Sequence, residues 1–205
     1  TVSGGELRAS GVGAHFEALG PTAINGARLQ ALNGGVLSLP GVTTFLTQRY
    51  AGTFNPDQNL EVTLWRARGE NSRIELPNLT SVAVGVTSDR VQVLWHAQAQ
   101  DGGFIDLSAV TTIVSTNTAD GYNRGARVSA TGAGSFIDLS ALVSMVDNDG
   151  EPQSWLEART GGVLDTRSLG TLTNVDLALD GTSGLDTAQL TSWTGGSSEI
   201  DVDGR

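Results

Sequence analysis

The sequence predicts an all-β chain that folds as a right-handed parallel β-helix, a β-solenoid of about seven coils. One apolar sequence motif, called the longer phrase below, recurs in a single orientation along the chain. A second motif with the pattern of a β-strand, called the shorter phrase, precedes each copy. Helix signals are poor, because glycine, threonine and β-branched residues are abundant. The 205 residues are 39% hydrophobic, which is enough for one buried core. We expect a single domain over 1–205, excised from a larger multidomain protein because both ends stop inside repeats.

The longer phrase reads small-small-x-apolar-polar-Leu-x-x-apolar-x-x-apolar. Its copies are GGVLSLPGVTTF (34–45), SRIELPNLTSV (72–82), GGFIDLSAVTTI (102–113), GSFIDLSALVSM (134–145) and GGVLDTRSLGTL (161–172), with a weaker echo, SGLDTAQLTSW, at 183–193. The first apolar anchors are Leu37, Ile74, Ile105, Ile137 and Leu164. One such unit cannot bury its apolar face alone, whereas stacked units would pair as parallel strands about 4.8 Å apart. An antiparallel sandwich would not explain the single orientation.

The shorter phrase alternates with period 2, as a half-buried strand does. Its copies are ELRAS (6–10), ARLQALN (27–33), LWRARGE (64–70), LWHAQAQ (94–100), ARVSATG (126–132) and WLEARTG (155–161). We align these copies on Ala31, Ala67, Ala97, Ala130 and Ala158. Trp65 and Trp95 then share a column with leucine and valine, which predicts that both belong to the core.

The segments between repeats vary most, and all leave the coil at the same place in the phrase. They are 46–59, 83–90, 114–124 and 146–154. Stacking gathers them on one flank, where repeat folds commonly bind ligands. Tyr50 and Tyr122 lie in these connectors, where they suit sugar stacking or ordinary turns.

The outward positions beside the alanine column form a polar strip rich in arginine. The column before it reads Gln30, Arg66, His96, Ser129 and Glu157; the column after it reads Leu32, Arg68, Gln98, Thr131 and Arg159. Arg127 and Trp155 share a third outward column, three residues before the alanine. Planar hydrogen-bonding groups around an indole suit sugars, because the ring covers C–H faces while polar groups pair with hydroxyls. The carbohydrate-binding candidates are Trp155, Arg66, Arg68, His96, Gln98, Arg127, Glu157, Arg159, Tyr50 and Tyr122. A solvated outer sheet face is the alternative interpretation.

Carboxylates form a second column, of Glu75, Asp106, Asp138 and Asp165. Stacked about 4.8 Å apart, they would raise one another's pKa or share cations. Such spacing also suits a retaining glycosidase. The alternative is a repeated turn or edge residue that hydrogen-bonds the next coil.

Asp147 and Asp149 lie in an acidic turn that could hold calcium through carboxylate oxygens. The turn departs from the EF-hand pattern, so a plain surface turn is the alternative.

Charge and composition exclude several classes of function. The net charge is −10, and all 12 basic residues are arginine. Such a chain lacks the excess of positive charge that is typical of nucleic-acid-binding proteins. Its charge is compatible with neutral ligands and with cations. The absence of cysteine and lysine excludes thiol and Schiff-base catalysis. No HExxH, GxSxG or Walker motif is present, and no apolar run is long enough for membrane insertion.

The phrases GGFIDLSAVTTI and GSFIDLSALVSM, with WLEARTGGVLD and ATGAG, carry a family resemblance over about residues 27–193. They resemble the parallel β-helix carbohydrate-binding modules appended to xylan-degrading enzymes, and also β-helix repeats of large bacterial surface proteins. The first resemblance implies a secreted or cell-surface, non-catalytic module that holds a covalently linked glycoside hydrolase on a plant polysaccharide, xylan favoured, without a cofactor. The alternatives are a structural or adhesive segment, and a polysaccharide lyase or hydrolase using Asp106, Asp138 and Asp165.

Overall fold

The computed structural model describes residues 2, 4–47, 53–55, 60–85, 92–116, 124–148 and 154–201. This part of the chain consists of strands and turns, without a helix that could cross a membrane. The strands stack into three parallel sheets, which confirms the predicted β-helix.

Each coil from β3 to β21 contributes one strand to each sheet, whereas the first coil contributes only β1 and β2. The first sheet holds β1 (Glu6–Ser10), β3 (Arg28–Leu32), β7 (Leu60–Arg68), β10 (Gln92–Gln100), β13 (Arg124–Thr131), β16 (Ser154–Arg159), β19 (Val175–Asp180) and β22 (Ser198–Asp201). The second holds β2 (His15–Glu17), β4 (Val36–Ser38), β8 (Arg73–Glu75), β11 (Phe104–Asp106), β14 (Phe136–Asp138), β17 (Val163–Asp165) and β20 (Gly184–Leu185). The third holds β5 (Thr44–Leu46), β9 (Ser81–Val84), β12 (Thr112–Ser115), β15 (Ser144–Asp147), β18 (Thr171–Thr173) and β21 (Ser192–Thr194).

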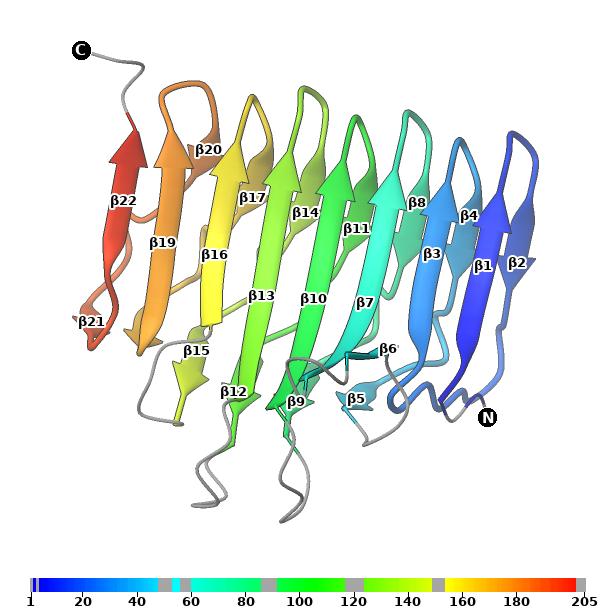
Figure 1. Cartoon of the computed structure of the whole chain (residues 1–205), viewed down its shortest axis with the longest axis horizontal. Coiled ribbons are helices and arrows are strands. Elements are labelled where there is room, and N and C mark those ends of the chain that lie inside the picture. The colour runs from blue at the N-terminus through cyan, green and yellow to red at the C-terminus, as the bar shows by residue number, and fades with distance from the viewer. Residues whose placement is uncertain are drawn as a thin grey trace.

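The coil is right-handed. In Figure 1 the strands of the first sheet rise in front, the chain returns downward behind them, and successive coils advance from right to left. Seven strands in the second sheet agree with about seven coils. One departure is β6 (Thr53–Asn55), inside a predicted connector, which pairs antiparallel with the start of β7.

Ladders of apolar side chains fill the interior. The predicted anchors Leu37, Ile74, Ile105, Ile137 and Leu164 are at most 1% exposed. Trp65 and Trp95 are fully buried, as predicted, and their ring centroids lie 5.2 Å apart with the planes at 89°. Phe45 packs 4.5 Å from Trp65, whose indole N–H donates to the Ala27 carbonyl. These contacts make the tryptophan pair part of the core rather than of a surface.

The turns between the first and second sheets hold three or four residues. In two of the four-residue turns a serine links neighbouring coils: Ser72 Oγ accepts from the Gly34 N–H at 2.9 Å and donates to the Arg68 carbonyl, and Ser135 bonds in the same way. The three-residue turns that end in glycine have no room for a side chain at that last position, because a Cβ at Gly103 would lie 2.1 Å from the Ala67 carbonyl oxygen. The coils therefore touch through their backbones at one edge of the first sheet.

Candidate functional site

The outer face of the first sheet carries most of the predicted site, but the predicted alignment of β10 is wrong by two residues. Ala99, not Ala97, joins the ladder of Ala67 and Ala130. Trp65 therefore lies opposite Ala97, and Trp95 lies between Thr63 and Ala126. Between β7 and β10 each indole thus faces a small side chain, whereas the predicted alignment would have placed the two indoles directly opposite each other in a close-packed core.

A two-residue shift keeps the alternation of faces, so His96 and Gln98 remain outward but change columns. Gln98, not His96, lies between Arg66 and Ser129. His96 instead lies between Leu64 and Arg127. The Trp155 column now contains a continuous run of His96, Arg127 and Trp155 on adjacent strands.

Arg127 stacks on Trp155, with its guanidinium carbon 3.7 Å from the ring centroid. Partial burial lowers the pKa of Arg127 to about 10, so it stays charged at neutral pH. His96 meets the indole edge-on, with 6.3 Å between ring centroids and 81° between planes. These two contacts hold the indole in place on one side, as in other cation–π and aromatic pairs.

His96 is neutral at physiological pH. Burial, followed by the charges of Arg127 and Arg66, lowers its pKa to about 4. Its Nε2 lies 2.9 Å from Ser129 Oγ. A neutral, hydrogen-bonded imidazole on this face can position a ligand but holds no proton to donate as an acid at pH 7.

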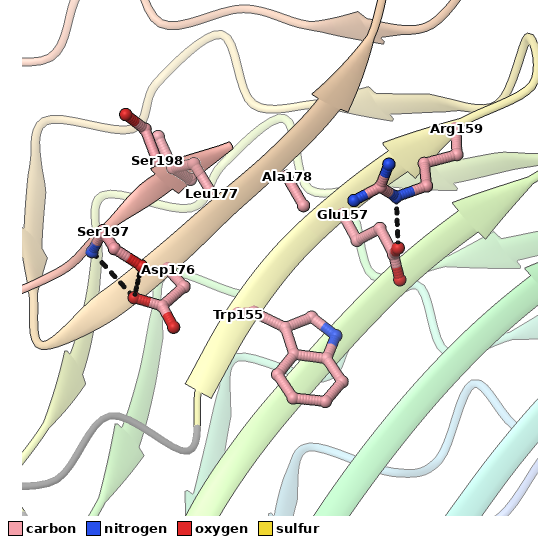
Figure 2. A pocket seen from close by; sticks show the side chains of 8 residues that line it. All are labelled: Trp155, Glu157, Arg159, Asp176, Leu177, Ala178, Ser197 and Ser198. Atoms are coloured by element: carbon pink, nitrogen blue, oxygen red, sulfur yellow. Dashed lines mark hydrogen bonds and ion pairs between the residues drawn. The ribbon is translucent and has the colours of Figure 1, made fainter. Parts of the chain in front are cut away.

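A cavity of about 290 Å³ opens on the other side of Trp155 (Figure 2). Its lining residues are Trp155, Glu157, Arg159, Asp176, Leu177, Ala178, Ser197 and Ser198. It forms where Ala178 follows Glu157 in the outward ladder, because the short alanine side chain leaves a gap between longer neighbours.

The polar groups around this cavity are preorganised. Arg159 Nε donates to Glu157 Oε1 at 2.7 Å. Asp176 Oδ1 accepts two hydrogen bonds from Ser197, one from the backbone N–H and one from the hydroxyl, both at 2.7 Å. The Trp155 indole N–H is buried and finds no acceptor among the described residues. The site therefore combines an aromatic side chain with fixed carboxylates.

A second cavity of about 290 Å³ lies on the same face, where β3, β7 and β10 end. It is lined by Leu32, Asn33, Arg66, Arg68, Gly69 and Asp101. Arg66 Nε donates to Gln98 Oε1 at 3.0 Å, and Arg68 Nε donates to Asp101 at 3.1 Å. Burial and then the charge of Arg68 lower the pKa of Arg66. The structure thus gathers every predicted candidate except the two tyrosines on one face, since Tyr50 and Tyr122 lie outside the described residues.

The predicted column of aspartates lies at the ends of strands in the second sheet, where the side chains stabilise the turns that follow. Asp106 and Asp138 each accept a hydrogen bond from the backbone N–H two residues later, at 3.0 and 2.9 Å. These bonds stay within one coil, so the expected link to the next coil is not what fixes them. For Asp165 the expected rise in pKa is wrong, because the hydrogen bond from the Arg167 side chain lowers its pKa.

The acidic turn proposed for calcium is described only at its start. Asp147 is fully buried, and its Oδ2 accepts from Ser154 Oγ at 2.7 Å. Asp149 lies outside the described residues. Within the described ranges no three His, Cys, Asp or Glu side chains gather as metal ligands would.

The sequence analysis missed an aromatic stack on the second sheet. Phe104 and Phe136 point outward with ring centroids 5.8 Å apart and planes at 6°, and Arg73 covers Phe104 at 4.1 Å. Beyond Phe136 lies a shallow hollow of about 450 Å³ over Val163 and Gly184. The signal was present, because both phenylalanines directly precede an inward isoleucine anchor and must face outward.

Comparison with known proteins gives no identification: no family model matches the chain, and no curated protein or solved structure matches it.

Proposed function

We propose that the chain is a non-catalytic carbohydrate-binding module, outside the cell or on its surface, that binds a plant cell-wall polysaccharide and holds an attached glycoside hydrolase there. Xylan is the favoured ligand through the resemblance noted above. The observation that carries the proposal is the Trp155 cavity, which joins an aromatic side chain to fixed polar groups. Such sites bind sugars by covering C–H faces and pairing with hydroxyls.

The carboxylates beside Trp155 support a polar ligand. Glu157 and Asp176 line the cavity and would accept hydrogen bonds from sugar hydroxyls.

The geometry of the sheet favours an extended ligand. Coils repeat about every 4.8 Å, near the length of one sugar unit in a linear glycan. A chain lying along the axis would meet the Trp155 cavity and then, coil by coil, the polar groups of Arg127, His96 and Gln98.

The alternative function is a structural or adhesive segment of a bacterial surface protein, here called the surface rod. It is favoured by the contacts that the outward side chains make with each other. Arg66 with Gln98 and His96 with Ser129 form pairs between neighbouring strands, and Arg159 pairs with Glu157 within β16. Such ladders stabilise a stacked face without any ligand. A rod of this kind would show no saturable binding to any glycan.

Retention on insoluble xylan by Trp155→Ala and Phe136→Ala variants tests the proposal. Trp155→Ala should lose most of the retention, because it removes the aromatic wall of the cavity. Phe136→Ala is the matched control, since it removes an outward aromatic ring from the second sheet. Full retention by Trp155→Ala, or loss confined to Phe136→Ala, would overturn the assignment of this face.

A further inference from the structure

The middle strands of the first sheet, β7, β10 and β13, carry outward charge opposite to that of the whole chain. The net charge is −10, yet the outward side chains described on β7, β10 and β13 include Arg66, Arg68 and Arg127 and no carboxylate. A local patch, not the net charge, decides which ligand charge a site accepts.

Arg66 and Arg68 are held close together although both are positive. They are two residues apart on one strand, so their backbones are separated by about 6.7 Å. Arg66 pairs with the neutral amide of Gln98. The salt bridge of Arg68 with Asp101 is exposed, with the two side chains 58% and 63% accessible. Asp101 therefore balances one of the two positive charges and leaves the other without a carboxylate partner among the described residues. The lowered pKa of Arg66 agrees with burial and with repulsion from Arg68.

The cavity between these side chains has the donors that an anion needs. Both arginines use Nε for the contacts above, and no described residue bonds their terminal nitrogens. Asn33, Gly69 and Asp101 also line the cavity, and Arg68 holds the Asp101 carboxylate. The guanidinium fork matches a planar carboxylate through two parallel hydrogen bonds.

We propose that the cavity of Arg66, Arg68 and Asn33 binds the carboxylate of a uronic acid in the polysaccharide, an inference that rests on the proposed function. The ligand class is therefore an acidic glycan, such as xylan with glucuronic acid side groups. The cavity lies three strands from β16, or about 14 Å along the axis, so one polymer chain reaches both the Trp155 cavity and the arginine pair. This assignment departs from the preference for neutral ligands and cations that the net charge suggests.

Titration calorimetry with three polymers tests the assignment: glucuronoxylan, the same polymer with its carboxyls reduced to alcohols, and sulfated xylan. The native chain should bind glucuronoxylan about tenfold more tightly than the reduced polymer, and added salt should remove this difference. The double variant Arg66→Gln/Arg68→Gln should lose the preference but still bind the reduced polymer. The control Arg73→Gln/Arg167→Gln removes two arginines from the second sheet and should keep it.

Each other outcome is decisive. Equal affinity for glucuronoxylan and its reduced form would overturn the carboxylate site while leaving carbohydrate binding intact. A clear preference for the sulfated polymer would assign the cavity to sulfate esters and overturn the carboxylate assignment. Loss of preference in the control variant would place the site elsewhere. If no polymer binds at all, the proposed function itself fails, and this site with it.

Discussion

Replacing Gly103 with alanine tests whether backbone contact sets the spacing of the coils. The new Cβ would lie 2.1 Å from the Ala67 carbonyl oxygen, whereas ordinary contacts begin near 3.4 Å. Neither atom can rotate away, so the two coils must separate and strain the 2.9 Å hydrogen bond from Phe104 N–H to the Ser72 carbonyl. Overpacking of this kind costs about 1–3 kcal/mol. With a loss of about 2 kcal/mol we expect the Tm to fall by about 4–8 °C for a chain of this length.

Thermal unfolding followed by circular dichroism measures this effect. Gly162→Ala should behave alike, because its Cβ would lie 2.2 Å from the Ala130 carbonyl oxygen. Gly20→Ala is the control: no atom lies within 4 Å of its Cβ position, so its Tm should not change. A Gly103→Ala protein that unfolds at the native Tm would refute the tight backbone stacking described above.

Three further predictions concern stability. Trp95→Ala should lower the free energy of unfolding by about 3–5 kcal/mol in urea titrations, because it empties a fully buried position. Ser135→Ala should cost about 1 kcal/mol in the same assay, since Ser135 accepts from the Gly102 N–H and donates to the Thr131 carbonyl. The pKa of His96 falls from 6.5 to about 4 on folding, so the unfolded chain binds more protons between these values. The free energy of unfolding should therefore keep the full contribution of neutral His96 above pH 6.5 and lose about 3 kcal/mol as the pH falls from 6.5 to 4. His96→Gln should remove this part of the pH dependence.

The architecture could be predicted because its signal repeats. An inward anchor such as Ile105 or Ile137 recurs with the same neighbours, and only a stacked parallel arrangement buries all copies. The error in the alignment of β10 arose because WHAQAQ contains two alanines. The spacing to the next anchor distinguishes them: Ala99 precedes Ile105 by six residues, like Ala31 before Leu37, whereas Ala97 would precede it by eight.

The candidate site was predictable as a face but not as a set of contacts. Period-2 alternation places Trp155 and Arg127 outward, but neither their stacking nor the cavity beside Ala178 follows from it, because both depend on which strand neighbours which residue. The aspartate column shows the opposite case. Its spacing suggested chemistry, while the hydrogen bond that Asp138 accepts from Ser140 shows a residue that shapes its own turn.

Affinity electrophoresis of the native chain tests the central claim most directly, in gels containing xylan, cellulose, mannan or pectin, with released sugar measured on the same samples. We expect retardation by xylan without released sugar. Free migration in every gel would contradict carbohydrate binding and favour the surface rod. Released reducing ends or unsaturated products that are abolished by Asp138→Asn would contradict the non-catalytic assignment. They would indicate that the aspartate column is catalytic.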